Sequence, residues 1–481
     1  MRVLVLTLCA AAAHDALAFS PAMSFTPRVG SPSISRASNL PGAFGKQPLL
    51  PARAESLLPT KAATGLDAQE TPQYEKLAPW RQNLDLAGWA SEVRAVEKKY
   101  RDGQGEADVK HLKKILNWSL ILYAIGLATA PFAAFPWNPI SAICLSTAIC
   151  ARWTMVGHHV SHGGYSAQVG IDNRFHRSKF GRGPVRRFID WCDWMQPEAW
   201  DVEHNFMHHY ELGENSDPDL LERNAHNVRI QKLPLPLRYL QMFSLMVMWK
   251  WFYYSPNTLK EMFDRQKMLA EKKGKGDTVI QPFQLPVAPG GFDPATKAAT
   301  VKYVIGEMFK LNFLPARVLF TSLAPYFMAH FVITPLIFYV LFGQVAATCA
   351  LVNLLAAEIL TNIHSFVIVV PNHAGEDVYR FETPVKVKSD EFYLRAVIGS
   401  VNFRTGSNVN DFAHGWLNYQ IEHHMFPDMS MLSYQRMAPE IKAICDKYGV
   451  PYVQENVFKR LHRTLQIGVG TKSMKVWERG D

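Results

Sequence analysis

Residues 318–357 read VLFTSLAPYFMAHFVITPLIFYVLFGQVAATCALVNLLAA, a run of 40 residues without Asp, Glu, Lys or Arg. A membrane-spanning helix needs about 20 predominantly apolar residues, so the run is long enough for two spans. Gly343 and Gln344 interrupt it near the middle. We therefore expect a hairpin of two transmembrane helices, at residues 318–341 and 345–370.

A second uncharged run, residues 115–151, precedes the first and is also too long for a single span. Its middle contains Pro136 and Pro139, and proline interrupts a helix. We expect helices at residues 115–135 and 139–157. Because backbone groups in lipid must be hydrogen-bonded within the segment, the sequence predicts an all-α integral membrane protein with four transmembrane helices in two hairpins.

Basic residues flank both hairpins at their open ends. They are Lys113, Lys114, Arg152, Lys310, Arg317 and Arg380. Neither hairpin tip carries a basic residue, so the positive-inside rule places the open ends on one side of the membrane. Residues 158–317 and 371–481 then share a compartment with the N-terminal region, and we expect them to form a helical cap domain.

The composition fits a membrane protein and excludes two other classes. Of the 481 residues, 48% are hydrophobic and only 19% are charged, against about a quarter charged in soluble domains. This apolar content is too high for a disordered chain. The six cysteines are scattered along the chain without paired spacing, which excludes a small disulfide scaffold.

Histidines are concentrated in three short segments on the shared side of the predicted membrane. The segments are HHVSH at 158–162, HNFMHH at 204–209 and QIEHH at 420–424. Residues four apart lie on one face of a helix, so His204 and His208 share a face and His209 points about a quarter-turn away. The first segment pairs His158 with His162 in the same way. We expect the cap domain to carry all three segments.

The number of histidines favours more than one metal ion. The three segments supply seven, or eight with His159. Imidazole is a suitable ligand for iron, zinc, copper and nickel, but one tetrahedral zinc needs only three or four ligands. The segments therefore predict two metals in one site. Iron is the expected metal for a redox-active pair in an imidazole-rich site.

Further histidines lie outside this spacing or less clearly within it. His364 stands near the end of the fourth expected span, where an ionisable residue indicates function. We expect it to be an extra metal ligand, with helix packing or a hydrogen bond to a ligand as the alternative. His159 and Gln420 are expected to bind the metal or to support the ligands. The histidines expected to be ordinary loop residues are His176, His226, His373 and His414.

Two other features near the segments receive a structural interpretation. Glu203, Asp217 and Asp219 are interpreted as solvated loop charges, with orientation of a ligand as the alternative. Residues 234–255 are apolar and aromatic but contain Arg238 and a lysine. We interpret this stretch as an interfacial helix rather than a span, with a re-entrant fifth helix as the alternative.

The third segment carries a family resemblance. Residues 415–427, GWLNYQIEHHMFP, resemble the third histidine box of front-end desaturases, in which Gln replaces the first His. The resemblance to the membrane fatty acid desaturase family covers about residues 110–450. It implies a non-haem di-iron centre that activates O2 and desaturates an acyl chain of a membrane lipid, with no catalytic residue beyond the metal centre. The second box has one residue more than is usual in front-end members, which leaves regioselectivity open.

The same resemblance implies which residues bind iron. The implied ligands are His158, His162, His204, His208, His209, His423 and His424, with His364 as an additional one. Gln420 is implied as a site residue. Two iron ions and O2 are thus the expected cofactor and co-substrate.

The expected electron donor is a separate protein. Many front-end members carry a fused cytochrome b5 with a His-Pro-Gly-Gly motif, which this sequence lacks. The net charge of +9 suits an acidic partner such as ferredoxin, with a separate cytochrome b5 as the alternative. No nucleic-acid motif is present, and no nucleic-acid partner is expected.

The N-terminal residues have the composition of a targeting sequence. Residues 1–18 combine an early Arg, an apolar stretch and Ala-Leu-Ala, which is typical of a signal peptide. Residues 19–78 are rich in Ser, Pro and Ala, with few acids, like a transit peptide. The combination resembles presequences of algae with secondary plastids. It predicts a plastid membrane with the site facing the stroma; the alternative is the endoplasmic reticulum.

These interpretations divide the rest of the chain. The predicted parts are an N-terminal soluble or interfacial segment at 79–114, a membrane desaturase domain at 115–455 and a C-terminal tail at 456–481. Histidine boxes alone leave other reactions open. The same type of site can serve a hydroxylase or ketolase of a lipid or carotenoid, and a membrane zinc hydrolase is an alternative of another class. A metal transporter is disfavoured, because the boxes lie outside the expected spans.

Overall fold

The computed structural model describes residues 78–133, 137–168, 170–275 and 319–477. All of them belong to one compact unit, Pro72–Asp481. The predicted signal peptide, and the predicted transit-like segment up to residue 77, lie outside the described residues. The described part is mostly helical, with four short strands.

Three of the described helical segments are long and apolar enough to cross a membrane. They are Pro139–Ser161, Leu319–Phe342 and Gln344–Asn372, and they agree with three of the four expected spans. The first consists of α5 (Pro139–Ala151), a π-helical turn and α6 (His158–Ser161). The second ends in α15 (Thr334–Phe342), and the third begins with α16 (Gln344–Val369).

The remaining expected span corresponds to α4, which runs from Glu106 to Thr129. Its first third is charged, with Glu106, Asp108, Lys110, Lys113 and Lys114. The uncharged part, residues 115–129, reaches about 22 Å at 1.5 Å per residue, less than the roughly 30 Å of a bilayer core. The four-span arrangement therefore stays a prediction.

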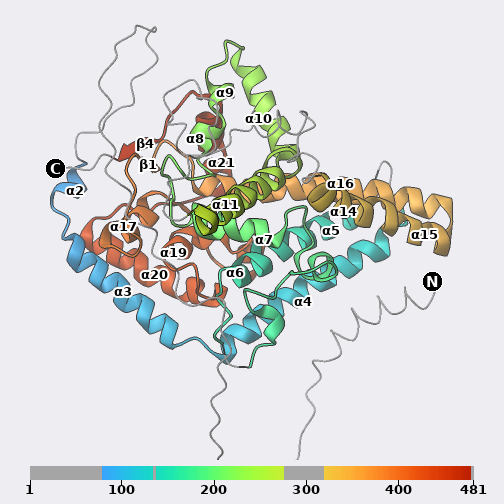
Figure 1. The fold of residues 1–481 in the computed structure, drawn as a ribbon, viewed down its shortest axis with the longest axis horizontal. Helices are drawn as coiled ribbons and strands as arrows, with labels where there is room; N and C mark the ends of the chain where they lie inside the picture. Colours follow the sequence, from blue (N-terminus) through green and yellow to red (C-terminus); the bar gives the residue numbers. More distant parts are fainter. Residues whose placement is uncertain (1–77, 134–136, 169, 276–318, 478–481) are drawn as a thin grey trace, which may run out of the picture. The chain divides into compact units, whose positions relative to one another are not determined.

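The long apolar helices α4, α5, α16 and α15 lie side by side in this order (Figure 1). Small residues allow the close approach of α4 and α5, because a Cβ on Gly126 would lie 2.6 Å from Leu145. The turn before α5 is fixed by Asn138, whose backbone N–H donates to Asn353 of α16 at 2.6 Å. Gly343 supplies the left-handed turn between α15 and α16, with φ of 85°.

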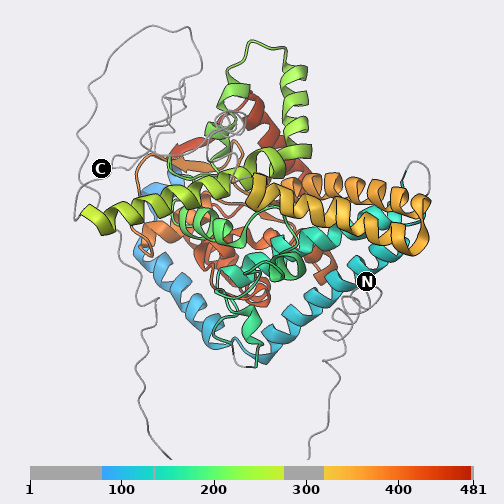
Figure 2. The same ribbon diagram turned by 45° about the vertical axis from the view of Figure 1, so that its right-hand side comes forward.

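The remaining elements lie at the end of these helices where the histidine segments are found (Figures 1 and 2). The helices are α2 (Pro79–Gln82), α3 (Leu86–Asp102), α7 (Pro197–Trp200), α8 (Leu221–Asn224), α9 (His226–Arg229), α10 (Leu235–Trp249), α11 (Ser255–Lys275), α17 (Asp390–Ile398), α18 (Asn408–Ala413), α19 (Gln420–Met425), α20 (Met431–Tyr448) and α21 (Val457–Val469). A further helical stretch, α14 (Ala324–Phe327), lies within the Leu319–Phe342 segment. The core between these elements is aromatic, with Trp153, Trp191, Trp200 and Trp416 at most 1% exposed.

The segment after residue 456, expected to be a tail, is folded into this unit. Strand β4 (Lys475–Trp477) pairs in parallel with β1 (Tyr379–Phe381). Just before the segment, β3 (Gln454–Glu455) pairs with β2 (Asn402–Phe403). Helix α21 packs against α10. Its Arg460 is fully buried and holds Asp377 at 2.7 Å. The C-terminal residues thus support the wall of the site.

Candidate metal centre

The first histidine segment lies at the end of an apolar span, on α6. The backbone N–H of His162 donates to the carbonyl oxygen of His158 at 3.2 Å, the four-residue spacing expected from the sequence. A Cβ on Gly157 would lie 2.7 Å from Trp191, so the missing side chain lets the tryptophan pack beneath the segment. The rings of His158 and His162 are therefore held at the end of this apolar helical segment.

The second segment differs from the expected α-helix. Residues Asp201–His208 form a π-helix, in which hydrogen bonds join residues five apart. The N–H of His209 accordingly donates to the carbonyl oxygen of His204 at 3.2 Å. This wider turn brings His209 onto the side of His204. His208, expected on the face of His204, points mainly toward a different group of histidines.

Five histidines meet in what we call the first cluster. Each ring offers one nitrogen, and these five nitrogens lie within 4.8 Å of one another. All five side chains are buried. The members are His158, His162, His204, His209 and His423. They come from all three sequence segments. The Nε2 atoms of His158 and His204 are 2.9 Å apart, and those of His204 and His209 are 3.2 Å apart.

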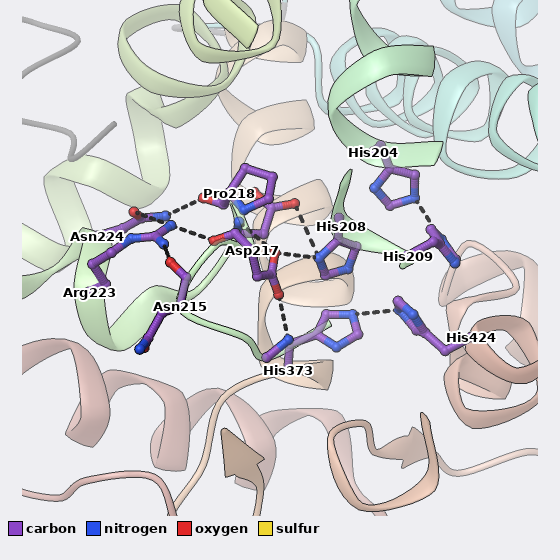
Figure 3. A network of polar contacts seen from close by, with 12 residues as sticks. His204, His208, His209, Asn215, Asp217, Pro218, Arg223, Asn224, His373 and His424 are labelled. Atoms are coloured by element: carbon purple, nitrogen blue, oxygen red, sulfur yellow. Dashed lines mark hydrogen bonds and ion pairs between the residues drawn. The ribbon is translucent and has the colours of Figure 1, made fainter. Parts of the chain in front are cut away.

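Three histidines form the second cluster, under the same distance criterion: His208, His373 and His424. The Nε2 atoms of His373 and His424 are 3.3 Å apart. The side-chain amide of Gln420 lies 3.0 Å from each of these two atoms. Figure 3 shows His208, His373 and His424 pointing toward one another. The sequence missed His373 because it stands alone; its position directly after a span, like that of His158, was the available signal.

The two clusters are adjacent. The rings of His209 and His424, one from each cluster, stack with centroids 4.2 Å apart. His204 of the first cluster and His208 of the second also form a possible metal-binding group with Asp219. The structure thus places two groups of possible metal-binding nitrogens next to each other.

Hydrogen bonds to the outer ring nitrogens fix which nitrogen carries the proton. Nδ1 of His158 lies 3.2 Å from the carbonyl oxygen of Thr154, and a carbonyl only accepts, so Nε2 is left with a lone pair. Tyr434 donates its hydroxyl to the carbonyl of Phe426 at 2.7 Å. Its oxygen can then accept from Nδ1 of His423 at 3.3 Å, which leaves Nε2 of His423 unprotonated.

His208 is oriented by a carboxylate. Its Nδ1 donates to Asp217 at 2.9 Å, and Asp217 also accepts from the backbone N–H groups of Gly213 and Asp219. Burial favours the protonated acid, but His208 outweighs it and holds the pKa of Asp217 below its ordinary value. Asp217 is thus a buried hydrogen-bonded anion and not a solvated loop charge.

The electrostatics favour neutral imidazoles at five cluster histidines, whereas Asp217 outweighs burial at His208 and raises its pKa. Burial, followed by the neighbouring histidines, holds the pKa well below its ordinary value in His162, His204, His209, His423 and His424. Unprotonated nitrogens that converge in a buried site repel one another unless a cation lies between them. The donor set therefore fits metal ions, which require neutral histidine.

Burial and the neighbouring carboxylate of Asp219 raise the pKa of Glu203 well above its ordinary value. Glu203 is therefore a buried carboxyl group and not the solvated loop charge expected from the sequence.

Two expected site residues lie outside both clusters. Nε2 of His364 donates to the carbonyl of Ala413 at 2.7 Å, which turns the ring toward α18. Nδ1 of His159 donates to the carbonyl of Met155 at 2.7 Å, and its ring centroid lies 5.3 Å from that of His423. His176, His226 and His414 also belong to no metal-binding group among the described residues.

A cavity of about 70 Å³ borders the clusters. On the metal side it is lined by His158, His204, His208, His373 and Gln420. The remaining wall is mostly apolar and aromatic, with side chains such as Trp153, Trp200, Tyr254 and Phe366. Trp200 also stacks on His204, with ring centroids 4.2 Å apart. The cavity thus has histidine side chains on one side and mostly apolar side chains on the other.

A model of the fatty acid desaturase family matches residues 135–456, more than half of the chain and all of the cluster histidines. The chain belongs to the fatty acid desaturase family. This membrane fatty acid desaturase is accordingly an oxidoreductase, and its histidine clusters are consistent with a metal centre.

Individual relatives support the assignment. A stearoyl-CoA 9-desaturase of Mycobacterium tuberculosis, NADPH-dependent by name, is 22% identical over 376 residues, covering 77% of this desaturase and 76% of that protein. An sn-1 linoleoyl-lipid 6-desaturase of Synechocystis sp. is 23% identical over 351 residues, 71% and 80% of the two chains. A fatty acid desaturase 2-like protein of Mus musculus matches locally, 37% identical over 79 residues, 16% of each chain. No solved structure matches significantly.

Proposed function

We propose that this desaturase introduces a double bond into an acyl chain of a membrane lipid, using O2 and a pair of iron ions. The observation that carries the proposal is the meeting of two adjacent histidine clusters. In them, Nδ1 of His158 faces the carbonyl of Thr154 and Nδ1 of His208 faces Asp217. One iron is held by the five histidines of the first cluster. The second is held by His208, His373 and His424, with Gln420 beside it. In this assignment His373 occupies the place that the sequence suggested for His364.

Bound iron supplies the oxidising power toward O2 that amino-acid side chains lack. The side chains of the protein hold the histidine rings in place and keep water away from the site. Asp217 holds the ring of His208 with its lone pair toward the second cluster. Trp200 stacks on His204 and restricts its ring. The apolar cavity wall seats an alkyl chain next to the clusters and excludes water.

The acyl carrier is part of the proposal. The Mycobacterium tuberculosis relative is named for a CoA thioester and the Synechocystis relative for a lipid, so both act on long acyl chains and differ in carrier. We favour a bilayer lipid because the cavity lies at the end of the apolar helices. Its wall includes Phe366 and Val369 of α16.

The electron balance requires an external donor. Reduction of O2 to two waters takes four electrons, of which two come from the two C–H bonds that break. The other two come from a donor protein, for which a ferredoxin is proposed and a separate cytochrome b5 is the alternative. The net charge of +9 supports an acidic donor. The presequence supports a plastid membrane with the site toward the stroma, rather than the endoplasmic reticulum.

The test is expression of the compact unit from Pro72 in a host that contains ferredoxin, followed by lipid analysis and metal analysis of the purified protein. We expect new unsaturated acyl chains, which disappear in the His204→Ala variant, and iron in the wild-type protein. Hydroxylated acyl chains or oxidised carotenoids in their place would indicate a hydroxylase or ketolase. Zinc without iron would favour the hydrolase.

A further inference from the structure

Helix α10 exposes an apolar face to the outside of the molecule. Six side chains on it or just before it are at least 37% exposed: Leu233, Leu235, Leu237, Leu240, Phe243 and Met248. The one charged residue of the helix, Arg238, is turned away, because its guanidinium donates to the carbonyls of Arg229 and Val469 at 3.2 and 2.7 Å. An uncharged exposed face of this size marks a contact with a membrane or another molecule.

This face continues a stripe of exposed apolar side chains on α16. Along α16, Val352, Leu355 and Ile359 are between 38% and 43% exposed. One turn after Ile359, the indole N–H of Trp249 donates to the carbonyl of Asn362 at 3.0 Å. Helix α10 therefore joins α16 where the exposed stripe ends, and it lies crosswise to α16 in both views (Figures 1 and 2).

The opposite face of α10 forms part of the cavity wall. Leu245 and Trp249 line the cavity together with Val369 and Val370, which end α16. Leu245, Val369 and Val370 are only half-buried, whereas the deep wall at Trp153 is fully buried. The cavity lining is thus partly exposed where α10 meets the end of α16.

We propose that α10 lies in the acyl layer of the bilayer surface and that an acyl chain of a bilayer lipid enters the cavity beside it, between Leu245 and the Val369–Val370 end of α16. A helix with an apolar face lies along the membrane interface in this way. Exposed Lys232, just before α10, can extend its aliphatic stem to the lipid head groups. The entry route rests on the proposed function, whereas the depth of α10 does not.

The depth is tested with full-length protein in phosphatidylcholine vesicles. Leu240→Cys is labelled with a small environment-sensitive fluorophore, and Ser91→Cys on the exposed, polar side of α3 is the matched control. Wild-type protein supplies the background of the native cysteines. Lipids brominated in their acyl chains should quench the Leu240→Cys label at least about twofold and leave the control unchanged. Equal quenching at both positions, or a signal that depends on protein concentration instead of lipid, overturns the proposal.

The route is tested by filling the wall. Leu245→Trp should lower product formation in lipid vesicles about tenfold with unchanged iron content and unchanged quenching of the Leu240→Cys label, because a larger side chain narrows the entry. Leu240→Trp, the same change on the outer face, should keep wild-type activity. Full activity of Leu245→Trp rejects the route. A wild-type protein that forms no desaturated product rejects the proposed function, while the quenching result still decides the depth of α10.

Discussion

At the scale of single residues, His373 is the member of a cluster that the sequence pattern did not predict. We expect His373→Ala to lose about half of the bound iron, because only His208 and His424 remain in the second cluster and three or more protein ligands are usual for a bound metal. Activity should fall at least about a hundredfold. Iron per chain, measured by plasma mass spectrometry on purified protein, checks the expectation.

The matched control for this variant is His364→Ala. Its ring donates to the carbonyl of Ala413 and lies outside both clusters, so the iron content should stay at the wild-type value. A protein that keeps its iron without His373 and loses it without His364 would restore the ligand set suggested by the sequence.

A variant of Asp217 tests whether the carboxylate that holds the ring of His208 contributes to metal binding. Replacement by Asn removes the anion that holds Nδ1–H of His208, and loss of such a partner lowers metal affinity or activity about 10–100-fold. Iron titration of the chelated protein measures the change. Glu214→Gln is the control, because burial raises the pKa of Glu214 to about 8 and Gln imitates its protonated form at pH 7. An unchanged affinity in Asp217→Asn would show that packing alone orients His208.

The sequence was sufficient to find most of the residues that meet in the clusters, because seven of the eight belong to the three histidine segments. Two details were beyond it. The π-helix at Asp201–His208 exchanges the expected roles of His208 and His209, and helix propensity carries no signal for it. His373 has no neighbouring histidine in the sequence. Only the folded chain, which brings residue 373 next to His208 of the second segment, shows that it belongs to a cluster.

At the scale of elements, a buried ion pair joins the cap to the apolar helices. Nζ of Lys250 lies 2.6 Å from Asp193 and 3.6 Å from Glu358 of α16, and all three side chains are at most 1% exposed. Removing one member of such a group leaves an uncompensated buried charge and destabilises by about 3–5 kcal/mol. We therefore expect Lys250→Met to lower the thermal stability of the protein in detergent clearly.

Two variants make the experiment on Lys250 decisive. Lys110→Met removes a lysine from an exposed pair with Glu106, where the expected loss is below about 1 kcal/mol. Adding Asp193→Asn to Lys250→Met should recover part of the stability, because one unpaired carboxylate disappears. Equal melting temperatures for Lys250→Met and Lys110→Met would contradict a stabilising role of the buried pair.

The apolar elements were predictable because their signal is long and uncharged. The expected helices at 139–157, 318–341 and 345–370 agree with the three apolar segments within a few residues. α4 differs because it begins at Glu106, nine residues before the uncharged run, and stops at Thr129. Packing on α5 lets the single helix α4 combine a charged start with an apolar end. A search for uncharged runs finds only the apolar part of such a helix.

At the scale of the whole molecule, the C-terminal segment decides whether the site keeps its wall. The family match ends at residue 456, immediately before α21. Yet α21 packs against α10, and a Cβ on Gly468 would lie 2.6 Å from Met242 of α10, so the two helices are in tight contact. The segment also supplies β4, the partner of β1.

A chain that ends at residue 456 should therefore lose stability and iron, although it keeps every histidine of both clusters. Removal of α21 exposes Met242, which packs against Gly468, and Ala374, whose carbonyl accepts from Arg460. Both residues are buried in the complete chain, and α10 is left without its support. A chain that ends at residue 477, after β4, is the control and should keep its iron and melting temperature. Normal iron content in the shorter chain would show that the metal site does not depend on residues 457–481.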